Sequence, residues 1–342
     1  MNSPAPPATR AGTTLAPAVL ATGLVKTYQV KGSSEPVRAL DGLGISVEPG
    51  IVFGLLGPNG AGKSTTVKIL TTLAAADSGH AVVAGHDVAA HPERVRRAIG
   101  VVAQRSGADP VATGRENLLL QGRLYGMRGA ALSSRADALL DRFDLTDAAK
   151  RQVTPYSGGM QRRLDVALGL IHRPQVLFLD EPTTGLDPEA RTAMWEEIAR
   201  LAGDEGLTIL LTTHYLEEAD RLAARLAIVD RGRIVAEGTP DELKGELHGD
   251  AVHVDLVRAP EAEALGVYEV LGRVPGVREI TVDGRRVSAR ADDGAAAVPA
   301  VLAALDQAGC PVAAVTVARP SLDDVYLRYA GRSFADAEGA TR

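Results

Sequence analysis

Residues Gly57 to Thr65 read G-P-N-G-A-G-K-S-T and fit the pattern G-x-x-x-x-G-K-[ST] of a loop that binds phosphate groups. Its glycines allow the backbone to curl, so that several N–H groups point toward one anion. Lys63 would bring a positive charge to the β- and γ-phosphates, and the Ser64 hydroxyl would be a ligand of Mg²⁺. We therefore predict a nucleoside triphosphate site formed by Gly57, Pro58, Asn59, Gly60, Ala61, Gly62, Lys63, Ser64 and Thr65.

Two acidic residues, Asp180 and Glu181, follow the apolar run Val176–Leu179. A buried strand would carry both side chains to the carboxyl edge of a parallel sheet, beside the phosphate loop. Asp180 could hold Mg²⁺ through its water shell, and Glu181 could polarise the water that attacks the γ-phosphate. The pair predicts that the bound nucleotide is hydrolysed.

A second glycine-containing turn, Ser157-Gly158-Gly159, precedes an apolar-periodic segment from Gln161 to Ile171. This order predicts a helix whose first N–H groups are free to bind an anion. The sequence S-G-G is common in loops, but here a single helix separates it from the acidic strand. We therefore predict that this turn is a second nucleotide-binding element.

A sheet of buried parallel strands must position these motifs. The apolar run Ile51–Leu56 precedes the phosphate loop, and Val176–Leu179 and Thr208–Thr213 are similar runs. Residues Asn117–Asp147 have helical patterns and no strand signal, which predicts a helical subdomain (about 105–160) inserted into an α/β domain at 18–238. The stretch 77–97 is rich in turn residues and ends in a basic helical segment, before a strand at 98–103.

The rest of the chain predicts a smaller domain at 250–331, joined by a polar and partly helical linker at 239–249. Its patterns follow the order β-α-β-β-α-β, which is a ferredoxin-like α+β unit, with a hairpin around Asp283-Gly284. Pro320–Tyr329 predicts a closing helix, and Asp323 and Asp324 would place negative charge in its first turn. Residues 1–17 and 332–342 predict disordered tails.

Composition excludes several classes of protein. The 342 residues carry 37 basic against 43 acidic side chains, so no overall field favours nucleic acid. Cys310 is the single cysteine, which rules out an internal disulfide and a cysteine-based metal cluster and fits a buried apolar position. No run of 18 apolar residues exists, and the start of the chain lacks the pattern of a signal peptide.

The phosphate loop, the S-G-G turn and the D-E strand, in this order, resemble the ATP-binding subunit of an ABC transporter. That resemblance implies a P-loop ABC ATPase fold with ATP and Mg²⁺ as cofactors. It also implies roles for further residues: Tyr28 would stack on adenine, Gln104 would contact Mg²⁺ and the attacking water, and His214 would touch the γ-phosphate. Asp187, in Gly185-Leu-Asp187, would lie in the loop that crosses to a partner subunit.

In this family the S-G-G loop completes the nucleotide site of the other subunit. The resemblance therefore implies a homodimer, in which Ser157, Gly158 and Gly159 of one copy face the phosphate loop of its twin. The usual signature is L-S-G-G-Q, whereas this chain has Tyr156-Ser-Gly-Gly-Met160 followed by Gln161. Ser157 and Gly159, which match the γ-phosphate contacts of the family, are both present.

Met160, the run Gln161–Ala167 and the ending Pro320–Tyr326 resemble, more narrowly, the ATPase of a two-gene drug exporter of the daunorubicin-resistance type. This implies ATP-driven export of drugs or antibiotics through a separate integral membrane permease. The subunit would be peripheral, at the cytoplasmic side of the cell membrane. The stretch from Gln104 through the helical insert would receive a short helix of the permease.

Two alternatives remain open from the sequence. The first is a soluble ABC-type ATPase of DNA repair or translation, but the chain lacks a long coiled coil, a second nucleotide domain and a basic tract for nucleic acid. The second keeps the ATPase and changes its cargo, as in an importer or a lipid or polysaccharide exporter. The chain itself does not specify the cargo.

Overall fold

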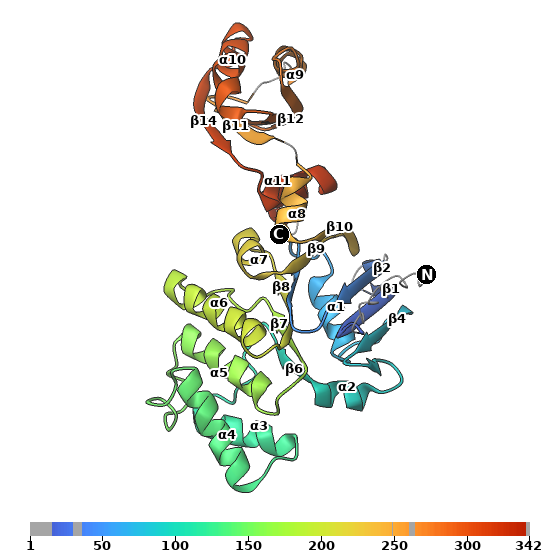
Figure 1. Cartoon of the computed structure of the whole chain (residues 1–342), viewed down its shortest axis with the longest axis vertical. Helices are drawn as coiled ribbons and strands as arrows, with labels where there is room; N and C mark the ends of the chain where they lie inside the picture. Colours follow the sequence, from blue (N-terminus) through green and yellow to red (C-terminus); the bar gives the residue numbers. More distant parts are fainter. Residues whose placement is uncertain (1–15, 30–35, 248, 260–263, 340–342) are drawn as a thin grey trace, which may run out of the picture.

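The structure is a computed structural model that describes residues 16–29, 36–247, 249–259 and 264–339. The disordered tail expected at 1–17 lies outside the described residues, apart from 16 and 17. The N-terminal α/β part of the chain, up to residue 238, forms the lower body in Figure 1, and a smaller unit stands above it. Among the described residues, no helix is both long and apolar enough to cross a bilayer.

A six-stranded sheet carries the motifs. Five neighbouring strands run parallel and the edge strand β10 is antiparallel to β9. All side chains of β3, β7 and β8 are buried, as expected for parallel strands covered on both faces. In sheet order the strands are β10 (Arg233–Gly238), β9 (Arg225–Asp230), β3 (Val52–Leu56), β8 (Thr208–Thr213), β7 (Val176–Asp180) and β6 (Ile99–Val102).

Helices cover this sheet and build the helical insert. Helix α1 follows the phosphate loop, and α5 and α6 pack on the side that Figure 1 shows in green and yellow. The insert contains α3 and α4, whose apolar side chains join the core of the α/β part through Leu118, Leu132 and Leu139. The bounds are α1 (Lys63–Leu70), α2 (Pro92–Ala98), α3 (Gly114–Leu124), α4 (Gly129–Arg142), α5 (Gly158–Leu170), α6 (Pro188–Gly203) and α7 (Leu216–Leu222).

A separate antiparallel sheet at the N-terminal side was not expected from the sequence. Its order is β2-β1-β4-β5, and two of its strands fall in the stretch 77–97 that was predicted to be turns before a helix. Only Ala81 and Val83 are buried in β4, so the strand lacks a clear apolar alternation. The bounds are β1 (Val19–Tyr28), β2 (Val37–Val47), β4 (Ser78–Val83) and β5 (His86–Asp87).

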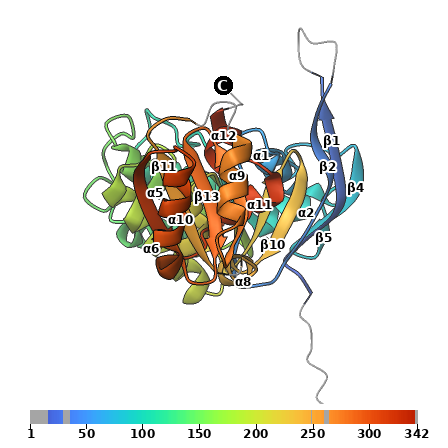
Figure 2. The same cartoon turned by 90° about the horizontal axis from the view of Figure 1, so that it is seen from above.

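The smaller unit is ferredoxin-like, as predicted. Its four antiparallel strands have the order β12-β13-β11-β14, and Figure 2 shows α9 and α10 in front of this sheet. Apolar side chains between the helices and the sheet form one core, which includes Val252, Leu271 and Val301, together with the buried Cys310. The bounds are β11 (Asp250–Leu256), α9 (Ala264–Gly272), β12 (Val277–Asp283), β13 (Arg286–Ala291), α10 (Gly294–Gln307) and β14 (Val312–Ala318).

Three short helices join the two parts: α8 (Pro240–Gly245), α11 (Leu322–Ala330) and α12 (Phe334–Gly339). The prediction of a disordered tail at 332–342 is wrong for its described residues. Phe334 and Ala337 are buried, and the Phe334 ring meets the Tyr326 ring edge-on at 4.9 Å. Two apolar residues one helical turn apart are too short a pattern to reveal such a helix in the sequence.

Helix α11 is anchored on the strand that lies beside β3. Tyr326 is fully buried, and its hydroxyl donates to Asp230 Oδ1 over 3.0 Å, where Arg332 Nη2 also donates over 2.8 Å. The surrounding apolar cluster includes Leu56, the last residue before the phosphate loop. The C-terminal helices therefore pack directly against the end of β3, next to the phosphate loop.

This anchor predicts a loss of stability at alkaline pH. Burial, together with the nearby Asp230 carboxylate, raises the pKa of Tyr326 from 10.0 to about 12. Since a raised tyrosine pKa favours the neutral side chain, its stabilisation is complete below pH 10 and is lost as the pH rises through about 12. We expect Tyr326→Phe to cost about 1.5 kcal/mol at neutral pH. Thermal unfolding across this window should show a smaller alkaline loss in the variant; an equal loss would contradict the assignment.

Candidate functional site

The phosphate loop closes over its own lysine. Lys63 is 4% exposed, and its Nζ donates to Gly57 O over 2.6 Å and to Pro58 O over 3.0 Å. Gly60 and Gly62 have φ values of 77° and 112°, which favour glycine. A Cβ at Gly57 would come within 2.3 Å of the Val229 carbonyl oxygen. The loop therefore needs its glycines for backbone shape and for close packing against β9.

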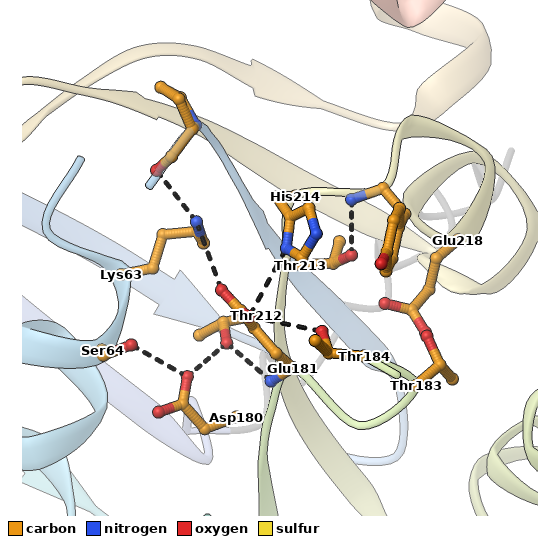
Figure 3. A network of polar contacts seen from close by, with 12 residues as sticks. Lys63, Ser64, Asp180, Glu181, Thr183, Thr184, Thr212, Thr213, His214 and Glu218 are labelled. Atoms are coloured by element: carbon orange, nitrogen blue, oxygen red, sulfur yellow. Dashed lines mark hydrogen bonds and ion pairs between the residues drawn. The ribbon is translucent and has the colours of Figure 1, made fainter. Parts of the chain in front are cut away.

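Asp180 and Ser64 meet at the end of the sheet, as Figure 3 shows. Ser64 Oγ donates to Asp180 Oδ1 over 3.1 Å, although 116 positions separate the two residues in the chain. Thr212 Oγ1 donates to the same carboxylate oxygen over 2.6 Å. A hydroxyl and a carboxylate are oxygen ligands that Mg²⁺ prefers, directly or through water, so the donor set fits this ion.

Glu181 lies at the centre of the site. Lys63 and His214 approach its carboxylate from two sides in Figure 3, with Lys63 Nζ 3.8 Å from Oε1 and His214 Nδ1 3.4 Å from Oε2. Thr184 Oγ1 donates to Oε2 over 3.3 Å. The Glu181 backbone has φ 49°, a left-handed conformation that a non-glycine residue rarely adopts. Such strain is common at functional residues, where the surrounding contacts hold it in place.

The electrostatics keep Glu181 ionised. Burial raises the pKa of its carboxyl, but hydrogen bonding to His214 and the charge of Lys63 outweigh this effect, and the pKa lies below the ordinary value. The Gln104 side chain adds a further hydrogen bond that lowers the pKa. At neutral pH the group is therefore a carboxylate, which can accept a proton or orient a water.

Two further residues were expected to contact the nucleotide, Gln104 and Tyr28, and they lie in different places. Gln104 follows β6 closely and reaches Glu181, so the structure brings it into the site. Tyr28 ends β1 on the antiparallel sheet, where it is 37% exposed and 5.4 Å from Lys26 Nζ, measured to the ring centre. Its exposed ring could stack on a base.

The S-G-G turn and Asp187 lie together on another part of the surface. Ser157 caps α5 by accepting from Met160 N, and Asp187 caps α6 by accepting from Ala190 N. A Cβ at Gly159 would come within 3.1 Å of the Ala190 Cβ, so the turn packs against the start of α6. Among the described residues, the polar contacts of Ser157 and Asp187 are local, and none of them reaches the phosphate loop.

Arg162, which sequence reasoning did not single out, fixes the backbone at the carboxyl edge of the sheet. The residue is 7% exposed, and its guanidinium donates to Ala103 O, Asp180 O, Glu181 O and Pro182 O over 2.5–3.1 Å. The residue therefore ties α5 both to the end of β6, one position before Gln104, and to the turn that contains Glu181. Burial lowers the pKa of this group from its ordinary value.

We expect Arg162→Met to lower the free energy of unfolding by about 2–4 kcal/mol, because four carbonyl oxygens lose their donor. Hydrolysis should also fall, since the Glu181 backbone is released. Unfolding can be followed through Trp195, the single tryptophan, which is buried in α6. Arg163→Met is the matched control on the same helix, because its side chain is 31% exposed. Equal losses in both variants would refute a special role for Arg162.

Comparison with known proteins gives two family matches. The ABC transporter family matches residues 40–184. The C-terminal domain family of DrrA1-3-like ATP-binding proteins matches residues 238–330. The two matches thus cover both parts of the chain.

Relatives with similar sequences extend over nearly the whole chain. It is 48% identical over 322 residues to the daunorubicin resistance ATP-binding protein DrrA2 of Streptomyces coeruleorubidus, covering 94% of this chain and 97% of that protein. It is 44% identical to the doxorubicin resistance ATP-binding protein DrrA of Mycobacterium tuberculosis, covering 91% and 92%. It is 38% identical to the Nod factor export ATP-binding protein I of Ralstonia nicotianae, covering 97% and 98%.

A solved structure agrees with the fold. A dimeric post-hydrolysis state of the ATP-binding cassette MJ0796, bound to ADP and Pi, has a TM-score of 0.59 and 26% identity, covering 65% of this chain and 98% of that chain. The chain belongs to the ABC transporter family, as an ATP-binding subunit that hydrolyses ATP. Within the family, it is similar to the ATP-binding proteins of daunorubicin and doxorubicin resistance. The resemblance drawn from the motifs is thereby confirmed.

Proposed function

We propose that two copies of this chain clamp two ATP molecules and drive a membrane exporter of drugs or antibiotics, docked to a separate membrane subunit at the cytoplasmic face. One observation carries the proposal. Within one chain, the phosphate loop and the acidic strand meet through the contacts of Ser64 with Asp180 and of Lys63 with Glu181. The Ser157 hydroxyl, in contrast, only accepts a hydrogen bond from Met160 N at the start of its own helix, α5. A single copy therefore offers two half-sites, and a twofold axis would pair each phosphate loop with the S-G-G turn of the other copy.

Each residue of the half-site has a defined task in hydrolysis. Lys63 neutralises the β- and γ-phosphates, and Ser64 and Asp180, with Gln104, would hold Mg²⁺, which adds positive charge next to the phosphates. Glu181 orients the attacking water and accepts its proton as the water oxygen bonds to the γ-phosphorus. The bond from that phosphorus to the β–γ bridging oxygen breaks, leaving ADP and inorganic phosphate. His214 lies 3.4 Å from Glu181 and would donate to the departing phosphate.

Drug resistance tests this function in a cell. A susceptible host should become resistant only when it carries this chain together with its membrane subunit, and Glu181→Gln should remove the resistance. A host that gains resistance from the membrane subunit alone would contradict the proposal. The neighbouring genes give a simpler check, since one of them should encode a membrane subunit with several transmembrane spans.

The surface between α2 and α3 supports docking to a membrane subunit. A groove of about 750 Å³ lies there, lined by residues that include Arg96, Arg97 and Leu124. Leu124 is 74% exposed, and Leu120, one turn earlier on α3, is 51% exposed. Exposed apolar residues that gather beside a groove are typical of an interaction site.

We expect Leu124→Asp to remove membrane association while ATP hydrolysis by the purified chain stays within about twofold of wild type, because an exposed position contributes little to stability. Leu73→Asp is the matched control, since Leu73 is 70% exposed and lies outside the groove. Association can be measured by co-purification with the membrane subunit. Unchanged co-purification of Leu124→Asp would remove the groove from the docking role.

Export of a lipid or a polysaccharide is the second candidate. The Nod factor export relative, at 38% identity over nearly the whole chain, favours it. Both candidates use the same ATPase and differ in the cargo of the membrane subunit. Transport assays with the two cargo classes, in one strain that carries both subunits, would separate them.

A further inference from the structure

The C-terminal unit contains a cavity of about 330 Å³ that none of the nucleotide motifs lines. It lies between its sheet and α11, and its walls include Leu247, Thr281, Ser288, Arg290, Asp324 and Leu327. Val287 and Ala291 of β13 pack in the core under α9 and α10. Because side chains alternate along a strand, Ser288 and Arg290 point to the opposite face, which is the floor of the cavity.

A buried guanidinium without a full set of partners reaches this cavity. Arg290 is 5% exposed, and its Nη2 lies 3.4 Å from Asp324 Oδ1. Its Nη1 is buried and has no hydrogen-bond partner among the described residues. Arg290 lines the cavity, and its ion pair with Asp324 uses only one of the five N–H donors of a guanidinium. Since unmet donors of a buried guanidinium are costly, the group has donor capacity left for an oxygen acceptor in the cavity.

Asp324 cannot supply that acceptor alone. Its Oδ2 accepts from Ser321 N and Ser321 Oγ, over 2.8 and 2.7 Å, and thereby caps α11. Its Oδ1 is shared between Arg290 Nη2 and His253 Nε2, which lies 3.7 Å away. The other acid on the wall, Glu279, lies 3.6 Å from Arg328 at the exposed rim. Both carboxylates are therefore already paired with other groups.

The cavity also has room and apolar surface for more than water. One water occupies about 30 Å³ in the liquid, and ligand pockets begin at about 300 Å³. Leu247, Ile280 and Leu327 supply apolar walls, while the Ser288 hydroxyl lies beside Arg290 on the floor. This combination fits a small organic acid whose carboxylate faces Arg290 and whose apolar body lies under α11.

We propose that this cavity binds a small monocarboxylate with an apolar body, and that Arg290 is the residue that recognises its carboxylate. The site is separate from the nucleotide site and does not depend on the cargo of the transporter. Its walls belong to both the sheet and α11, so a bound acid would join these two elements.

Benzoate is a suitable probe, with benzyl alcohol as its uncharged counterpart of similar shape. We expect saturable binding of benzoate to the full chain by calorimetry and much weaker binding of benzyl alcohol. Arg290→Met should weaken benzoate binding by about tenfold or more, the effect of losing a hydrogen bond to a charged group. Arg286→Gln is the matched control, because Arg286 is 61% exposed on the same strand and pairs with Asp255 outside the cavity.

A second variant keeps the charges in place. Thr281→Met should fill the cavity, leave Arg290 and Asp324 unchanged, and reduce benzoate binding as strongly as Arg290→Met. ATP binding should stay unchanged in every variant and serves as the measure of correct folding. No saturable benzoate binding to the wild-type chain, or equal affinity for benzoate and benzyl alcohol, would overturn the proposal. Equal benzoate binding by wild type and a folded Thr281→Met would place the ligand elsewhere.

Discussion

Glu181→Gln should leave ATP binding intact while kcat falls by about 10²- to 10⁴-fold, the range for loss of a general base. The amide keeps the size of the side chain, and it can still accept from Thr184 and lie beside His214. It cannot take a proton from the attacking water. In the proposed dimer the γ-phosphate then remains between the two copies, so the variant should accumulate as an ATP-bound dimer.

Size-exclusion chromatography with and without ATP, together with a phosphate-release assay, measures both effects. Glu189→Gln is the matched control, since Glu189 lies exposed in the first turn of α6. The control should hydrolyse ATP at the wild-type rate. A Glu181→Gln variant that stays monomeric in ATP and still releases phosphate would remove Glu181 from the catalytic role.

Lys63→Ala should raise the dissociation constant for ATP by about 30-fold or more. Removing one partner of a buried charge pair costs about 2–5 kcal/mol, and each 1.4 kcal/mol is tenfold in affinity. Lys63 is 4% exposed, and two carbonyl oxygens of the phosphate loop hold its ammonium, so the positive charge already lies within the loop in the free protein. The loss should therefore appear in binding itself as well as in turnover.

Isothermal titration with ATP in the presence of magnesium measures this affinity. Lys68→Ala is the matched control, because Lys68 lies on the same helix and is exposed. It should bind ATP as the wild type does. Unchanged affinity in Lys63→Ala would show that the predicted phosphate contact is absent.

Much of the fold could be predicted because the sequence motifs lie directly after buried parallel strands. The apolar runs before Gly57 and Asp180 predict strands, and parallel strands bring their carboxyl ends to one edge, where Ser64 and Asp180 do meet. The ferredoxin-like unit was likewise predictable, since its strands and helices alternate with clear turn signals such as Asp283-Gly284.

Other features leave no readable pattern in the sequence. An arginine on a helix usually faces solvent, so nothing in the Gln161–Ala167 run distinguishes the buried Arg162 from the partly exposed Arg163. The left-handed backbone of Glu181 arises from tertiary contacts rather than from its residue type. Strand β4 has too few buried residues for an alternation, and α12 is too short for a helical period.

Mixing two inactive variants tests most directly whether each ATP is held by two chains. Lys63→Ala disables the phosphate loop. Ser157→Asp keeps the cap of α5, because aspartate is also a favoured cap, but places a negative charge against the γ-phosphate. Each variant alone should hydrolyse almost no ATP. In a mixed dimer, one site combines the intact Lys63 of one copy with the intact Ser157 of the other, so the mixture should regain activity. A mixture that stays inactive while the two variants associate would contradict shared sites.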